Sequence, residues 1–178
     1  VYKRQVMRAL ANAQQSLSGG TTSLRDLGGR DFLEFAVRDA CNSGEQFGPT
    51  IRAAGQIICM TGGHGNQHGR VADGPDEVIK AVREQIHAGS DVIKLMATGG
   101  VMTPGVNPED AHYSESELRI GVEEGHRFHR TCASHAQGSA GILNAVRAGM
   151  DSIEHGIFMT DECCLLYTSP SPRDRSLS

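Results

Sequence analysis

The feature that most constrains the fold of this chain is a regular alternation of short apolar segments with amphipathic ones. Five segments have the β-branched or continuously apolar character of buried strands, and the segments between them have helical apolar spacing. This alternation indicates right-handed βαβ crossovers and a parallel sheet. The predicted strands cover residues 21–26, 50–58, 91–96, 131–135 and 151–155, and the predicted helices cover 32–41, 75–87, 115–129 and 139–148.

Residues at the helix ends support these assignments. Gly89 and Gly149 follow two of the predicted helices, where a left-handed residue commonly ends the helix. Ser114 with Glu117 three residues later is the pattern of a capping box. Asp73 precedes the helix that opens with Pro75, and we expect its carboxylate to cap that helix.

Two parallel α/β folds fit the alternation, a doubly wound sheet and a barrel. The chain lacks the GxGxxG pattern expected between the first strand and helix of a doubly wound sheet, and polar residues recur where strands end. We therefore predict an α/β fold, a partial (β/α)8 TIM barrel of about five βα units corresponding to strands two to six. Because the complete barrel has eight units in roughly 250 residues, we expect the chain to be incomplete at both ends.

The predicted barrel domain covers residues 11–162. Residues 1–10 are interpreted as a non-native or unassigned leader. Residues 163–178 are rich in Ser, Pro and Arg toward their end and continue no strand or helix pattern, so we interpret them as a disordered, translated adaptor sequence outside the domain.

Charge and cysteine content narrow the classes of partner. The 17 basic and 21 acidic residues form no long runs, which argues against a nucleic-acid or anionic-membrane surface and favours a small-molecule substrate. No apolar stretch approaches the roughly 20 residues that span a bilayer. The five cysteines form no CxxC pair, which indicates a reducing compartment, and we expect a cytoplasmic protein. Cys132 is expected to be a small buried packing residue.

Three residues near strand ends carry the predicted chemistry. A lysine in an apolar strand is costly unless it is paired, neutralised or modified, and Lys94 stands in the apolar segment 91–96. His135 and His155 end the next two predicted strands, so the three side chains would meet at one rim of the sheet. Neutral imidazoles bind zinc, and a lysine carbamate would add an oxygen donor that bridges two cations. We predict a centre for one or two divalent ions, zinc foremost, held by these residues.

Four motifs resemble those of the amidohydrolase superfamily, in its imidazolonepropionase-like and Xaa-Pro dipeptidase (prolidase)-like branch. They are residues 21–26 (TTSLRD), 91–94 (DVIK), 134–138 (SHAQG) and 151–156 (DSIEHG). The resemblance implies a (β/α)8 barrel with a carboxylated lysine on strand four and histidines on strands five and six, which correspond to Lys94, His135 and His155.

The resemblance also implies parts that this chain lacks. A His-x-His motif on strand one and an aspartate after strand eight, the general acid/base, have no counterpart here, and Asp161 is not assigned that role. The implied parent enzyme is a metal-dependent hydrolase of amide or peptide C–N bonds that acts through a metal-activated hydroxide on a dipeptide or cyclic amide. We expect this segment alone to be inactive and the parent to be a homo-oligomer.

Three further residues are predicted to contact substrate. By resemblance, the glycine-rich loop that holds His64 lines the substrate pocket. Arg70 would bind a substrate carboxylate with both guanidinium nitrogens, and Gln137 lies two residues beyond His135.

Two alternatives stay open at this point. A desolvated lysine on a barrel strand also suits a Schiff-base, aldolase-type enzyme, in which Lys94 would be trapped on a carbonyl substrate by borohydride. The second alternative is that the segment is a non-catalytic barrel remnant, whose open sheet edges would favour poor solubility or oligomerisation.

Overall fold

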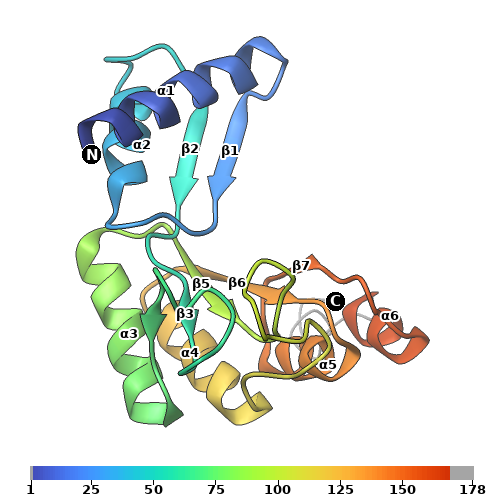
Figure 1. The fold of residues 1–178 in the computed structure, drawn as a ribbon. Helices are drawn as coiled ribbons and strands as arrows, with labels where there is room; N and C mark the ends of the chain where they lie inside the picture. The colour runs from blue at the N-terminus through green and yellow to red at the C-terminus, as the bar shows by residue number, and fades with distance from the viewer. Residues whose placement is uncertain (1, 169–178) are drawn as a thin grey trace, which may run out of the picture.

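The computed structural model describes residues 2–168 and contains the predicted alternation of parallel strands and helices (Figure 1). Its elements in chain order are α1 (Tyr2–Ser18), β1 (Ser23–Asp26), α2 (Leu33–Asn42), β2 (Thr50–Ala53), β3 (Ile58–Cys59), β4 (Arg70–Val71), α3 (Gly74–Ala88), β5 (Val92–Met96), α4 (Glu115–Arg127), β6 (Thr131–Ala136), α5 (Ser139–Ala148), β7 (Ser152–His155) and α6 (Asp161–Thr168).

The strands form two parallel sheets, β1-β2 and β4-β3-β5-β6-β7. The prediction of one continuous strand over 50–58 is wrong, because Gly55 takes a left-handed backbone (φ 77°) and separates β2 from β3. The two sheets are joined where Asp91 donates its N–H to the carbonyl of Ala53 (2.9 Å) and accepts from the Ala53 N–H with its carboxylate (3.0 Å). The short strand β4 is an element that the sequence pattern did not indicate.

An ion pair shows how strongly these strands curl. Arg25 on β1 and Glu154 on β7 lie 2.6 Å apart. Between them lie β2, which Asp91 joins to the start of β5, and then β5 and β6. In a flat sheet four inter-strand spacings would hold β1 and β7 roughly 19 Å apart, beyond the reach of the two side chains together. The strands therefore curve toward one another as in part of a barrel, with β1, β2, α1 and α2 above the other elements in Figure 1.

The two faces of β5 and β6 separate the outer core from the barrel interior. Ile93, Leu95 and Cys132 are fully buried in the large cluster between the sheet and helices α3, α4 and α5. Val92 and Met96 point to the opposite face, where they belong to two small clusters. Burying one leucine side chain stabilises the fold by about 1.5–3 kcal/mol, so the outer layer dominates the packing energy and leaves the interior face free for polar residues.

The helix ends follow the predicted chemistry with one exception. The Ser114–Glu117 capping box is present, and Gly89 and Gly149 end α3 and α5 with φ of 103° and 89°. Asp73 stands at the N-cap position of α3 but makes no capping hydrogen bond. Its carboxylate accepts instead from the backbone N–H (3.0 Å) and the hydroxyl (2.5 Å) of Thr61, which fixes the start of the loop after β3.

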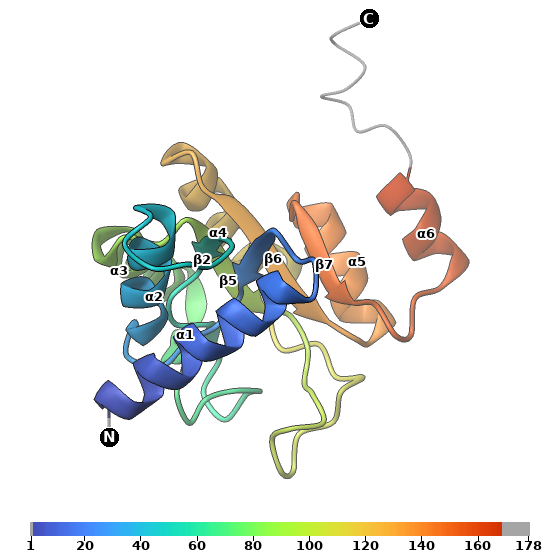
Figure 2. The same ribbon diagram turned by 90° about the horizontal axis from the view of Figure 1, so that it is seen from above.

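The described helices extend across both predicted domain boundaries. Helix α1 runs through residue 11, and its Ala13 packs with Val37 and Ile51 in a cluster shared with α2 and β2. Helix α6 runs through residue 162 beside α5 (Figure 2), and Cys163 is fully buried. The part of the predicted disordered tail at 169–178 lies outside the described residues. Among helices α1 to α6, none has the length and apolar character needed to cross a membrane.

Candidate metal centre in the partial barrel

A cavity of about 480 Å³ opens at the carboxyl ends of the strands and is lined by all three predicted ligands. Its walls come from strands β5, β6 and β7, from the loops that follow β1, β3 and β5, and from Ile57 just before β3. The lining residues are Leu27, Gly28, Ile57, His64, Gly65, Gln67, His68, Lys94, Met96, Met102, Thr103, His135, Glu154 and His155.

Lys94 lies on the interior face of β5 and is only 5% exposed. Within residues 2–168 its ammonium makes no hydrogen bond or ion pair. Burial lowers the pKa of Lys94 to about 8, with Glu154 opposing and Arg25 reinforcing the shift. The amine is therefore far more readily neutral than that of an ordinary surface lysine, which is the state that can react with an electrophile such as carbon dioxide.

His135 pairs with Met96 in register and therefore shares the interior face with Lys94. Its Nε2 lies 2.8 Å from the Gly99 carbonyl, an interaction that requires Nε2 to carry the proton and donate it. Nδ1 is then unprotonated, and no group within residues 2–168 hydrogen bonds to it. Burial lowers the pKa of His135 to about 4, so the imidazole is neutral at physiological pH.

His155 reaches the same cavity through an unusual backbone. It pairs with Ala136, a residue of the outer core, so simple strand alternation would turn His155 toward the helices. Its φ of 79° is left-handed and redirects the side chain to the cavity, where the rings of His135 and His155 have centroids 4.7 Å apart. Because β7 is the last strand of the sheet, His155 remains exposed to solvent.

These residues match the donor chemistry of a divalent metal site. A metal-bound histidine usually donates its second ring N–H to a backbone carbonyl or carboxylate, as His135 does to Gly99. A carbamate on Lys94 and the imidazole of His155 would complete three donors from neighbouring strands. Among the His, Cys, Asp and Glu side chains of residues 2–168, the only group of three donor atoms within 4.8 Å of one another lies elsewhere, at His126, Cys132 and Asp151.

His64 is held over the cavity by the loop that follows β5. Its Nδ1 lies 2.9 Å from the Thr103 hydroxyl, which also accepts from the Gly65 N–H (3.1 Å). The His64 ring packs on His135 with centroids 4.6 Å apart, and its far edge rests against Gly100, where a Cβ would come within 2.6 Å of Nε2. Burial lowers the pKa of His64, so its neutral form is favoured in this position.

The other two predicted substrate contacts lie away from this cavity. Arg70 is bound by two carboxylates of α3, with Nε 2.6 Å from Glu84 and a terminal nitrogen 3.1 Å from Glu77. The hydrogen bond to Glu84 is the main cause that raises the pKa of Arg70. Gln137 is buried beside Thr98, to which it donates its backbone N–H (3.0 Å), and its side-chain oxygen has no hydrogen-bond partner within residues 2–168.

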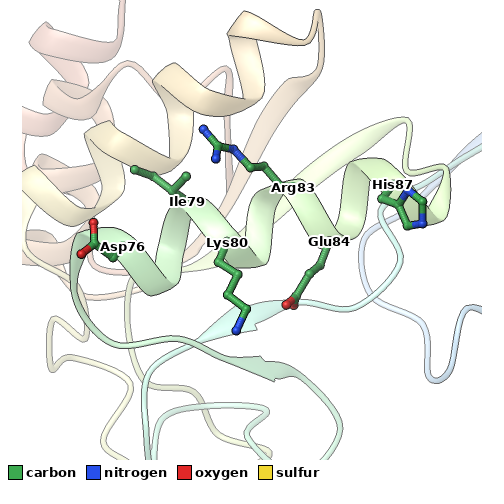
Figure 3. Close-up of a pocket in the computed structure, with 6 residues that line it drawn as sticks. All are labelled: Asp76, Ile79, Lys80, Arg83, Glu84 and His87. Atoms are coloured by element: carbon green, nitrogen blue, oxygen red, sulfur yellow. The ribbon is translucent and has the colours of Figure 1, made fainter.

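A second hollow lies on the outer surface of α3, and its residues all come from that one helix (Figure 3). It combines charges of both signs without bringing groups from different elements together. A groove of this kind is an ordinary helix surface, so the interior cavity is the better candidate site. The residues are Asp76, Ile79, Lys80, Arg83, Glu84 and His87.

Comparison with known proteins agrees with this geometry. The model of the amidohydrolase family matches residues 5–165, which is most of the chain. The chain belongs to the amidohydrolase family. Its parallel α/β fold is correspondingly part of an amidohydrolase barrel. The family match begins before residue 11 and extends beyond residue 162.

Individual amidohydrolases resemble the chain over most of its length. Ochratoxinase from Aspergillus niger is 36% identical over 173 residues, which cover 83% of this chain but 35% of the relative. A crystal structure of a Xaa-Pro dipeptidase with methionine in its active site superposes with a TM-score of 0.88 at 34% identity, over 92% of this chain and 44% of that one. A crystal structure of a prolidase complexed with N-methylphosphonate-L-proline superposes with a TM-score of 0.83 at 34% identity, over 90% of this chain and 43% of that one. This chain thus spans well under half the length of these amidohydrolases.

Sequence reasoning missed several residues of the amidohydrolase cavity. Glu154 appeared only inside a motif, although its pairing with His135 puts it on the interior face. Thr103 and Met102 come from the loop after β5, which has no strand or helix period to indicate where it folds. The alternation of interior and exterior positions would have identified Glu154, whereas the loop contacts had no sequence signal.

Proposed function

We propose that the whole protein is a metal-dependent hydrolase that cleaves amide or peptide C–N bonds. The observation that carries this proposal is that Lys94, His135 and His155, from three neighbouring strands, line one cavity at the carboxyl ends of the strands. Residues at this end of barrel strands are the ones that perform chemistry in enzymes with this fold. Membership of a family that includes an ochratoxinase and Xaa-Pro dipeptidases supports the same reaction class.

Each of the three residues would have a separate task. Neutral Lys94 would attack carbon dioxide through its amine, lose a proton to solvent and become a carbamate with oxygen donors. His135 would bind through Nδ1 while Gly99 fixes its ring, and His155 would bind from the edge strand. When bound, one or two zinc or similar ions would supply a water of lowered pKa and polarise the scissile carbonyl.

The substrate proposed is a dipeptide or a cyclic amide. His64, held by Thr103, lines the cavity and would contact the substrate, whereas Gln137 does not line the cavity and is assigned no contact. Ile57, Met96 and Met102 give the cavity apolar walls suited to an uncharged side chain. We leave Arg70 out of this proposal because Glu77 and Glu84 already bind its guanidinium. We place the protein in the reducing cytoplasm, since the buried cysteines Cys41, Cys59, Cys132 and Cys163 form no disulfide.

Two measurements test the proposed centre. The metal-free chain carrying His126→Gln and Asp151→Asn, which removes the other group of donors, should bind zinc in bicarbonate buffer. Adding Lys94→Met or His135→Ala should remove that binding, while adding Lys80→Met on the surface of α3 should not. With ¹³C-bicarbonate, a carbamate signal should appear in the NMR spectrum of the wild type and disappear in Lys94→Met.

Activity is tested on the whole protein that contains this segment. It should hydrolyse Xaa-Pro dipeptides or cyclic amides and lose that activity on chelation and in Lys94→Met. Zinc binding that survives Lys94→Met and His135→Ala in the chain carrying His126→Gln and Asp151→Asn, or hydrolysis insensitive to chelators, would contradict the proposal.

Lys94 alone also suits a second reaction class. A buried lysine with a pKa near 8 is a good Schiff-base nucleophile. In that case borohydride would trap a carbonyl compound covalently on Lys94, and mass spectrometry would locate the adduct. Absence of any adduct together with zinc-dependent hydrolysis would decide for the amidohydrolase reaction.

A further inference from the structure

A second group of metal-binding side chains lies at the opposite end of the sheet from the cavity. His126 is in the last turn of α4, Cys132 is near the start of β6, and Asp151 directly precedes β7. Their donor atoms, one nitrogen, one sulfur and one oxygen, all lie within 4.8 Å of one another. Cys132 and His135 are three residues apart on β6 and on opposite faces, which separates this group by roughly 10 Å along the strand from the candidate centre.

The three side chains are held in place by the surrounding backbone. Asp151 accepts the Cys132 N–H with Oδ2 (2.7 Å) and donates its own N–H to the Cys132 carbonyl (3.0 Å). The same Oδ2 lies 2.7 Å from Nε2 of His126. Two of the donors are therefore already joined by a shared proton, and a cation would take the place of that proton.

The thiol of Cys132 makes the weakest hydrogen bonds of the three donors. It is fully buried, and its contacts with the carbonyls of Val122 (3.9 Å) and Arg130 (4.0 Å) are long. The side chains of His126 and Asp151 are 28% and 39% exposed, so a cation can enter from solvent and a water can complete the coordination. Nitrogen, thiolate and carboxylate together suit zinc, cobalt or cadmium better than magnesium or calcium.

We propose that His126, Cys132 and Asp151 form a structural site for a thiophilic divalent ion, with zinc the natural occupant. Tetrahedral zinc separates its donor atoms by roughly 3.5 Å, so the nitrogen and oxygen would open slightly and the sulfur would move closer. The thiol proton leaves to solvent, the imidazole binds through Nε2 with its proton on Nδ1, and the carboxylate and thiolate balance the charge of the ion. The ion would connect the end of α4 to the starts of β6 and β7.

Cobalt(II) provides a test that the candidate centre cannot imitate, because no cysteine lines that cavity. The chelator-stripped 178-residue chain should develop thiolate-to-cobalt charge-transfer absorption in the near ultraviolet, with one thiolate per site. The band should disappear in Cys132→Ser. It should persist in Cys41→Ser, which changes a buried cysteine of another cluster, and in Lys94→Met, which disables the candidate centre.

The two partly exposed ligands supply variants that leave the core unchanged. His126→Gln and Asp151→Asn should each weaken cobalt binding by roughly tenfold or more, since even the partners of metal ligands contribute 10- to 100-fold to affinity. If Cys132→Ser fails to fold by circular dichroism, these two variants decide the question. Absence of a thiolate band in the wild type, its loss in Cys41→Ser, or wild-type affinity in both His126→Gln and Asp151→Asn would overturn the proposal.

Discussion

Replacing Lys94 with methionine should stabilise the metal-free chain while it abolishes binding at the candidate centre. Burial lowers the pKa of Lys94 from 10.5 to about 8, so the folded state binds this proton less tightly than the unfolded state does. At 1.36 kcal/mol for each pKa unit, the charged lysine costs the fold about 3 kcal/mol wherever the pH lies below 8. Methionine has a similar unbranched chain and no charge, so Lys94→Met should recover most of that free energy at pH 7.

The stability difference between Lys94→Met and the wild type should depend on pH, and this dependence provides an internal control. As pH rises from 8 toward 10.5 the folded lysine loses its proton first, so the wild type gains stability relative to Lys94→Met. The advantage of the variant should then fall from about 3 kcal/mol at pH 7 to about 1 kcal/mol at pH 10. Urea unfolding followed by circular dichroism measures both values in buffers free of metal and carbon dioxide.

Lys80→Met is the matched surface control, because Lys80 is exposed on α3 (Figure 3). The free energy of unfolding of Lys80→Met should differ from that of the wild type by less than about 0.5 kcal/mol at either pH. If Lys94→Met proves no more stable than the wild type at pH 7, the amine is not desolvated as the structure indicates and the argument fails.

Three further outcomes follow from the structure. The low pKa of His135, about 4, favours the neutral ring in the folded state, so the free energy of unfolding of the metal-free chain should fall by about 3 kcal/mol as pH falls from 6.5 through 4. Urea titrations should show this loss in the wild type and not in His135→Gln, and an equal loss in both would mean that another group causes it. Ser114→Ala removes the capping box with Glu117 and should cost about 1 kcal/mol, seen as a lower melting temperature without a change in zinc binding; an unchanged melting temperature would refute this. The ion pair between Arg25 and Glu154 is partly exposed, so a double-mutant cycle with Arg25→Met and Glu154→Gln should give a coupling of about 0.5 kcal/mol, and a value near 3 would contradict the exposed fractions.

The parts of the fold that the sequence predicts well are those with a strong local signal. Residues 92–96 are apolar except for Lys94, and β5 covers them with the lysine buried on the interior face. Ser114 with Glu117 defines the start of α4, and Gly149 defines the end of α5. In each case a few neighbouring residues determine the conformation, so no knowledge of tertiary contacts is required.

The errors concern features set by distant contacts. The break at Gly55 is stabilised by Gln85 on α3, whose side-chain oxygen accepts the backbone N–H of Gln56 (2.9 Å). Arg70 has the chemistry to bind a carboxylate, yet Glu77 and Glu84 on one face of α3 are the carboxylates it meets. A sequence pattern identifies such groups but does not say which partner is near.

Lys94, His135 and His155 were predicted to meet at one rim of the sheet and all three line the cavity, but the backbone turn that brings His155 there was not predicted. The alternation of side chains along β6 and β7 would have sent His155 toward the helices, and only its left-handed backbone brings it to the cavity. His64 came from a loop, and its position depends on Thr103 in a different loop. Loops follow no strand or helix period, so their mutual contacts must come from coordinates.

The turned backbone at His155 has a practical consequence for anyone who redesigns this site. The direction of the imidazole is determined by the main chain rather than by a rotamer, so transplanting the histidine into an ordinary strand end of another barrel would send its ring the wrong way. A graft must carry the unusual torsion with it, together with Gly156, whose φ of 58° continues the bend. In a library randomised at position 155, asparagine and glycine should be recovered as folded variants far more often than valine or isoleucine.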